Sequence, residues 1–207
     1  MTVPYVSTGR ANQKARTRDA LIAATRGLLS EGRIPTMEDA ATAASISRTT
    51  AYRYFPNVRS LLVSAYPHAE KDSLLGDEPP QDPADRLRLV AENHTRRILD
   101  YEPEMRAVLR LSLGDEPADR SVLPMHRGQR IGWIVDALAP LKGEMDEKTL
   151  RELSLGIGST LGIEAFVWLT DIAGLSREDA AATMCLNASR LLRAAIVEND
   201  APGGSLA

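Results

Sequence analysis

The sequence predicts an all-α protein with a small N-terminal domain and a larger C-terminal one. Apolar residues recur at helical spacing along the chain, and the alternating β-branched and aromatic runs typical of strands are missing. Glycine and proline divide the N-terminal part into short segments. A chain of 207 residues with 43% hydrophobic and 26% charged residues has enough apolar surface for one or two cores.

The first helix is predicted from about residue 12 to residue 30. Leu21 and Leu28 are seven residues apart, as are Ile22 and Leu29, so these side chains share one apolar face. Gly32 follows and ends the helix. The residues before it, 1–11, are expected to form a flexible arm.

Two short helices come next, each with its own start signal. Thr36 opens the first, and Asp39 stands three residues later, as in a capping box. Ser47 caps the second, which is predicted to run through Phe55. Asn57 then caps a fourth helix. Residues 12–62 are therefore expected to form one compact domain.

The remainder of the chain, residues 63–200, is predicted to form the larger helical domain. The pair Asp82-Pro83 is a cap followed by proline at the first helical position. The helices expected beyond it are 83–101, 103–113, 121–141, 146–173 and 176–198. The tail, residues 201–207, is expected to be disordered.

The formal net charge of −3 conceals an uneven distribution. Residues 1–60 contain nine basic and four acidic side chains, whereas the rest contains 16 basic and 24 acidic ones. A basic N-terminal part followed by an acidic remainder favours contact with phosphates through the N-terminal part. A chance fluctuation of charge remains the alternative interpretation.

Several classes of protein are disfavoured by composition. Cys185 is the single cysteine, so no intramolecular disulfide can form, and the N-terminus lacks the apolar core of a signal peptide. Polar residues interrupt the longest apolar run, 153–169, which is too short to span a membrane. We therefore expect a cytoplasmic protein without a membrane segment.

The segment from residue 36 to residue 62 has the pattern of a helix-turn-helix. Its second helix carries polar and basic side chains suited to phosphates or base edges. These candidates are Ser47, Arg48, Thr49, Thr50, Tyr52 and Arg53. Ala51 and Phe55, four residues apart, are expected to pack inward.

The helix-turn-helix and the helix before it, roughly residues 12–62, resemble the N-terminal domain of TetR-family transcriptional regulators. The residues that carry the resemblance are Thr36, Ala40, Ala41, Ala44, Ile46, Ser47, Thr50, Tyr52, Arg53, Tyr54, Phe55, Pro56, Leu61 and Leu62. The resemblance implies an N-terminal three-helix DNA-binding domain, a C-terminal domain for ligand binding and dimerisation, and a palindromic double-stranded DNA operator. Repression is implied by the family and not by any single residue.

The resemblance also assigns roles. It implies that the following residues face the DNA: Thr36, Ser47, Arg48, Thr49, Thr50, Tyr52, Arg53 and Tyr54. Arg48 and Thr49 are expected to read bases, and the two tyrosines to hold phosphates. Lys14 and Arg16 belong to a basic segment, with Arg10 and Arg18, that either reaches the DNA backbone or minor groove or stays solvated.

Three positions depart from the family pattern. Ser45 stands where a turn glycine is usual, Ala51 replaces a larger aliphatic residue, and Val58 replaces a lysine that commonly holds the DNA backbone. Arg59, next to Val58, is the expected substitute for that phosphate contact.

Two stripes with spacings of three and four residues predict close helix packing near the C-terminus. They comprise Gly158, Leu161, Ala165, Trp168 and Ile172, and Ala181, Met184, Ala188, Leu191 and Ala195. The resemblance implies that these helices form a four-helix bundle with a second copy. Packing into the core of the same chain is the alternative.

The resemblance further implies a pocket for an unknown small-molecule effector between about residues 83 and 173. Aromatic, histidine and methionine side chains often line such cavities. The candidates are His94, Tyr101, Met105, Met125, His126, Trp133, Phe166 and Trp168. The alternative is that most of these side chains only fill the hydrophobic core and bind no ligand.

A rival hypothesis is a helical enzyme or small-molecule-binding protein whose N-terminal bundle is only structural. The three histidines are scattered, and no catalytic triad, phosphate loop or metal-ligand cluster is recognisable. No catalytic residue, metal or cofactor is therefore expected. A second rival is a DNA-binding regulator that senses no ligand.

Overall fold

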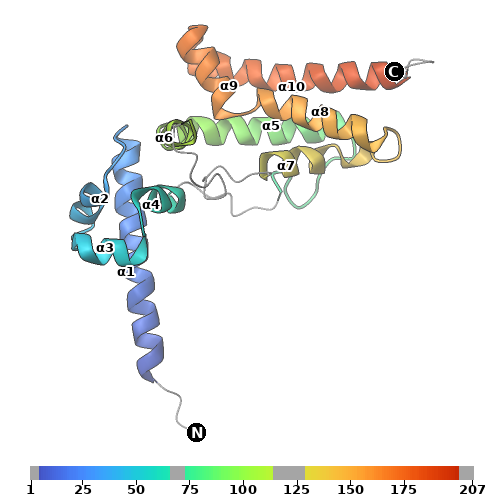
Figure 1. Cartoon of the computed structure of the whole chain (residues 1–207). Coiled ribbons are helices and arrows are strands. Elements are labelled where there is room, and N and C mark those ends of the chain that lie inside the picture. Colours follow the sequence, from blue (N-terminus) through green and yellow to red (C-terminus); the bar gives the residue numbers. More distant parts are fainter. Residues whose placement is uncertain (1–4, 66–72, 114–128, 201–207) are drawn as a thin grey trace. The chain divides into compact units, whose positions relative to one another are not determined.

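A computed structural model of the chain describes residues 5–65, 73–113 and 129–200, without the side chains of residues 5–11, 63 and 111. These ranges contain helices and turns (Figure 1), with one isolated bridge between Lys142 and Met145 and no strand. The prediction of an all-α fold is confirmed. The chain forms two compact units.

The first unit combines residues 1–68 with residues 103–125. Its helices are α1 (Tyr5–Ser30), α2 (Met37–Ala43), α3 (Arg48–Tyr54), α4 (Val58–Ala65) and α6 (Glu102–Ser112). The helix α1 begins seven residues before its predicted start, within the expected arm, because residues 5–11 contain no proline to stop it. It continues beyond α2 and α3 at its N-terminal end (Figure 1).

The core of the first unit joins α1 to the three short helices after it. Its buried side chains are Leu21, Met37, Ala40, Ala41, Ala51, Phe55 and Leu61. A second cluster adds α6, because Ala107 packs with Leu29, Leu62 and Ala65. The sequence assigned this helix to the larger domain, since nothing in its own residues identifies its packing partner.

The second unit combines residues 69–102 with residues 126–207. Its elements are α5 (Pro83–Asp100), α7 (Gln129–Ala137), the 3-10 helix η2 (Ala139–Leu141), α8 (Glu147–Thr160), α9 (Ile163–Val167), the π-helix η3 (Trp168–Ile172) and α10 (Arg177–Asp200). The helix α10 packs along α5 and α8, and α7 packs against the same two helices (Figure 1).

The predicted single helix 146–173 is wrong, because it is broken at Gly162. This glycine has an extended backbone and begins α9. A Cβ atom there would overlap the side chains of Arg130 and Glu164, which form an ion pair of 2.6 Å. Gly158 allows α8 to approach α7 closely, since a Cβ atom at this position would lie 2.6 Å from Cδ1 of Ile131.

Five of the ten residues in the two predicted stripes are buried inside the second unit. Gly158, Leu161, Ala181, Met184 and Ala188 are all buried within the chain. Burial within the chain is what the alternative interpretation expects of these five residues, and the dimer interface stays a prediction. Ala165 and Ala195 are half-buried, whereas Trp168, Ile172 and Leu191 are exposed.

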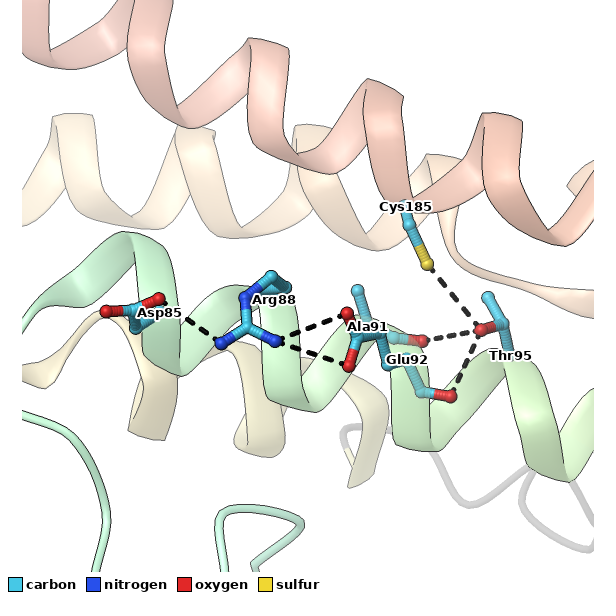
Figure 2. Close-up of polar contacts among 6 residues, drawn as sticks. All are labelled: Asp85, Arg88, Ala91, Glu92, Thr95 and Cys185. Atoms are coloured by element: carbon cyan, nitrogen blue, oxygen red, sulfur yellow. Dashed lines mark hydrogen bonds and ion pairs between the residues drawn. The ribbon is translucent and has the colours of Figure 1, made fainter.

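The contact between α5 and α10 includes the cysteine. The hydroxyl of Thr95 donates to the carbonyls of Ala91 and Glu92 on α5, and its oxygen lies 3.6 Å from Sγ of Cys185 on α10 (Figure 2). Burial raises the pKa of the Cys185 thiol, which therefore stays protonated at neutral pH.

None of the described helices is by itself long and apolar enough to cross a membrane. The helix α8 and the following α9–η3 segment meet the length and composition criteria only as a pair bent by 42°.

Candidate nucleic-acid interface

The first helix of the motif is fixed by the predicted capping box. The backbone N–H of Asp39 donates to Oγ1 of Thr36 at 3.2 Å, and Oδ2 of Asp39 accepts from the backbone and hydroxyl of Thr36. These hydrogen bonds lower the pKa of Asp39, so the carboxylate is charged at neutral pH. The hydroxyl of Thr36, a predicted DNA contact, is exposed but already bonded to Asp39.

The turn of the motif depends on Ser45, which has a φ of 56°. The N–H of Ser45 donates to the carbonyl of Thr42, and the N–H of Ile46 to that of Ala41, which is the hydrogen-bond pattern of a Schellman motif. Glycine is the usual residue in this left-handed conformation. Ser45 thus occupies the turn-glycine position and has its backbone conformation.

The second helix, α3, is held by its cap and by two buried side chains. The N–H of Thr50 donates to Oγ of Ser47, whose hydroxyl donates to Oγ1 of Thr50 at 2.8 Å. Ala51 is completely buried and Phe55 is 3% exposed, as their spacing predicted. Because these two side chains face inward, the opposite side of α3 faces solvent.

That solvent-facing side carries Arg48, Thr49, Tyr52 and Arg53, all exposed. The guanidinium of Arg48 lies 5.7 Å from the ring centroid of Tyr52. It also lies 3.6 Å from the carboxylate of Glu38 on α2. A cation, hydroxyl groups and an aromatic ring are thus brought together on one face, which suits phosphates and base edges.

Three other predicted DNA contacts are less accessible. Thr50 is half-buried and bonded to Ser47. Tyr54 is half-buried and packs against the core of the unit. Arg59, the expected substitute for a lysine, is half-buried, with its Nε atom enclosed.

The basic residues of α1 differ in their surroundings. Lys14 and Arg16 are exposed. Arg18 lies over the ring of Phe55, 5.5 Å from its centroid, and reaches Oγ of Ser64. The side chain of Arg18 therefore helps to hold α1 against α4 and against Phe55, the C-cap of α3, while Lys14 and Arg16 remain available to a polyanion.

The effector candidates do not form one group. Trp133 and Phe166 are buried in the second unit, and Tyr101 and Trp168 are exposed there. Met105 is buried in the first unit. Met125 and His126 lie outside the described residues.

His94 is the candidate with the most unusual surroundings. Its ring lies 5.5 Å from that of Trp133, and its enclosed Nδ1 atom has no hydrogen-bond partner. Burial, followed by the charges of Arg130 and Arg97, lowers the pKa of His94 to about 4. The imidazole is therefore neutral at physiological pH.

Sequence reasoning missed the charged groups around this histidine. Arg130 on α7 and Glu164 on α9 form the ion pair at Gly162, and one oxygen of Glu164 is enclosed without a partner. No sequence signal connects residues 34 positions apart. Within the described ranges no group of three or more His, Cys, Asp or Glu side chains could hold a metal ion.

The comparisons with known proteins concern the fold. A crystal structure of a TetR transcriptional regulator from Rhodococcus sp. RHA1 matches with a TM-score of 0.55 and 20% sequence identity. The match covers 87% of this chain and 98% of that one. No protein-family model and no curated protein matches the sequence. The chain therefore has the fold of a TetR regulator.

Proposed function

We propose that this protein is a DNA-binding transcriptional regulator, a repressor that binds a palindromic operator as a homodimer and is released by a small-molecule effector. The observation that carries the proposal is the exposed face of α3. There Arg48, Thr49, Tyr52 and Arg53 project from a capped helix inside a unit with a basic N-terminal segment. The shared fold supports a regulator rather than an enzyme.

The recognition helix of such a motif lies in the major groove. Arg48 and Thr49, in the first turn of α3, are the residues proposed to reach base edges. Tyr52, one turn later, is proposed to hold a phosphate. Lys14 and Arg16 are proposed to add sequence-independent contacts, which salt would weaken.

Homodimerisation is proposed because one motif alone reads few bases. Two recognition helices about 34–36 Å apart would enter successive major grooves and read a palindrome. Exposed apolar side chains on η3 and α10 support an interface there. They are Trp168, Ile172, Leu186 and Leu191, of which Ile172 is 72% exposed.

An effector can release the protein from DNA only if it binds one conformation of the protein better than the other. We place that ligand in the second unit and propose that α4, which follows the motif, transmits the change. Repression is proposed because a bound dimer blocks polymerase without further contacts. A cytoplasmic location without cofactor completes the proposal.

The first test is selection of bound fragments from a random-sequence DNA pool at low and moderate salt. The expected result is enrichment of a two-fold symmetric site, with recovery falling as salt rises. Absence of enrichment at both salt concentrations would contradict the proposal.

The second test measures binding of Arg48→Ala to the selected site by fluorescence anisotropy. Loss of a bidentate base contact should weaken binding by about 1–3 kcal/mol. Arg33→Ala is the matched control, because Arg33 is an exposed arginine of the same unit that pairs with Glu31. Equal loss in both variants would show that only total charge matters, and would contradict the placement of the recognition helix.

A further inference from the structure

A cavity of about 580 Å³ lies in the second unit between α7, α8 and the segment that connects them. Its volume is within the range of small-molecule pockets, about 300–1,000 Å³. None of the effector candidates that the structure describes lines it. The cavity is therefore separate from the surroundings of His94.

The lining of the cavity is mainly apolar. The aliphatic and methionine side chains that contribute to it are Ile131, Val135, Leu138, Met145, Leu150 and Leu155. Ser154 is the buried polar residue among the lining residues, and its hydroxyl already donates to the carbonyl of Leu150 at 2.7 Å. The interior of the cavity thus offers no free hydrogen-bond donor from Ser154 and suits a hydrocarbon group.

The charged side chains of the lining are Lys142, Arg151 and Glu147, all exposed. Among the described residues, neither Lys142 nor Arg151 forms an ion pair or hydrogen bond through its side chain. By contrast Lys148, which is not part of the lining, pairs with Glu152 at 4.0 Å. Two cations and one carboxylate therefore give the opening of the cavity a net charge of +1. Neither cation is engaged by another described side chain.

We propose that this cavity binds an amphipathic carboxylate, whose hydrocarbon part fills the apolar interior while the carboxylate meets Lys142 and Arg151. An ammonium headgroup would face the same two cations and be repelled. A neutral headgroup would gain only the apolar contacts. The proposal concerns ligand binding by the second unit and does not depend on DNA binding by the first.

The test uses three ligands with one hydrocarbon chain, namely octanoate, 1-octanol and octylammonium. Binding to the full chain is measured by isothermal titration calorimetry. Octanoate is expected to bind most tightly and octylammonium most weakly. Equal affinity for octanoate and octylammonium, or no binding of octanoate, would overturn the proposal.

Variants then locate the site. Lys142→Gln and Arg151→Gln should each weaken octanoate binding by about threefold to tenfold and leave 1-octanol unchanged. Lys148→Gln is the matched control, because it removes one cation of α8 outside the cavity and should bind octanoate like the unaltered protein. An equal loss in Lys148→Gln would overturn the assignment to this cavity.

A variant that blocks the cavity sterically tests the location of the site without changing any charge. Val135 is 40% exposed on α7 and lines the cavity, so Val135→Trp should fill part of it without disturbing the core. Loss of binding for both octanoate and 1-octanol is expected, with a melting temperature near that of the unaltered protein. Retained binding of both ligands in this variant would place the site elsewhere.

Discussion

The guanidinium of Arg48 lies 3.6 Å from the carboxylate of Glu38, so an acid on α2 holds the cation proposed to read bases. A phosphate or guanine must displace this carboxylate, which would itself repel DNA. Glu38→Gln is therefore expected to tighten binding to the selected operator by about twofold to fivefold, consistent with the small energy of exposed ion pairs. Fluorescence anisotropy measures the change.

Glu31→Gln is the control for this prediction. It removes one negative charge from the same unit, and Glu31 pairs with Arg33 instead of with Arg48. Its effect on affinity should be smaller than that of Glu38→Gln. Weaker binding by Glu38→Gln would mean that the ion pair positions Arg48 for DNA instead of competing with it.

The turn residue Ser45 provides a prediction about stability. At a φ of 56° its Cβ atom is crowded, and glycine removes the crowding. Ser45→Gly should raise the free energy of unfolding by about 1 kcal/mol, measured by urea denaturation. Ser45→Ala keeps the Cβ atom and should give no gain, so an equal gain in both variants would contradict this explanation.

Replacement of Arg86 should destabilise the protein more than replacement of most other polar residues in the second unit. Its buried side chain donates to the carbonyls of Pro80, Asp136 and Ala137 and pairs with the carboxylate of Asp136. Removing it leaves these acceptors without their donor. Arg86→Met should therefore lower the free energy of unfolding by about 2–3 kcal/mol, because the carbonyls around the buried guanidinium lose their hydrogen bonds.

Two residues further along α5, Arg88 is the comparison for Arg86. It forms exposed ion pairs with Asp85 and Glu92, drawn in Figure 2. Such pairs contribute up to about 1 kcal/mol. Urea denaturation of Arg88→Met should show that smaller loss, and losses of similar size in the two variants would contradict the role given to Arg86.

His94 predicts how stability depends on pH. Below pH 6.5 the unfolded chain takes up a proton on this imidazole, whereas the folded chain resists protonation until pH is about 4. The free energy of unfolding should therefore fall as pH falls through this window, by up to about 3 kcal/mol from this group. At pH above 7 both states are neutral at His94, and its contribution is constant.

His94→Gln tests this assignment because glutamine does not titrate. Urea denaturation between pH 4 and pH 8 should give a flatter curve for the variant than for the unaltered protein, and parallel curves above pH 7. Curves that stay parallel down to pH 4 would show that other groups cause the dependence.

Local signals in the sequence predicted the helix starts. Thr36, Ser47 and Asp82 each cap the helix that follows, because a cap depends on residues only two or three positions away. Ala51 and Phe55 were also assigned correctly to the core, since helical spacing determines which side chains share a face.

Features that depend on distant residues were not predictable. The ion pair between Arg130 and Glu164 lies against the break at Gly162, and the burial of Met184 depends on the α5 and α8 surfaces beneath α10. A stripe of small residues predicts close packing but does not identify the partner. For the same reason the exposed residues of α3 could be predicted from spacing, whereas the ion pair between Glu38 and Arg48 could not.

The position of α10 at the C-terminal end of the second unit determines when that unit can fold during synthesis. Thr95 and Cys185, which meet between α5 and α10, are 90 residues apart. The ribosome therefore releases α5, α7 and α8 with the apolar surface for α10 uncovered, and only the last helix closes the core. Chains that terminate before residue 176 should accordingly be substrates for chaperones and proteases, whereas α1 to α4 emerge consecutively and can pack early.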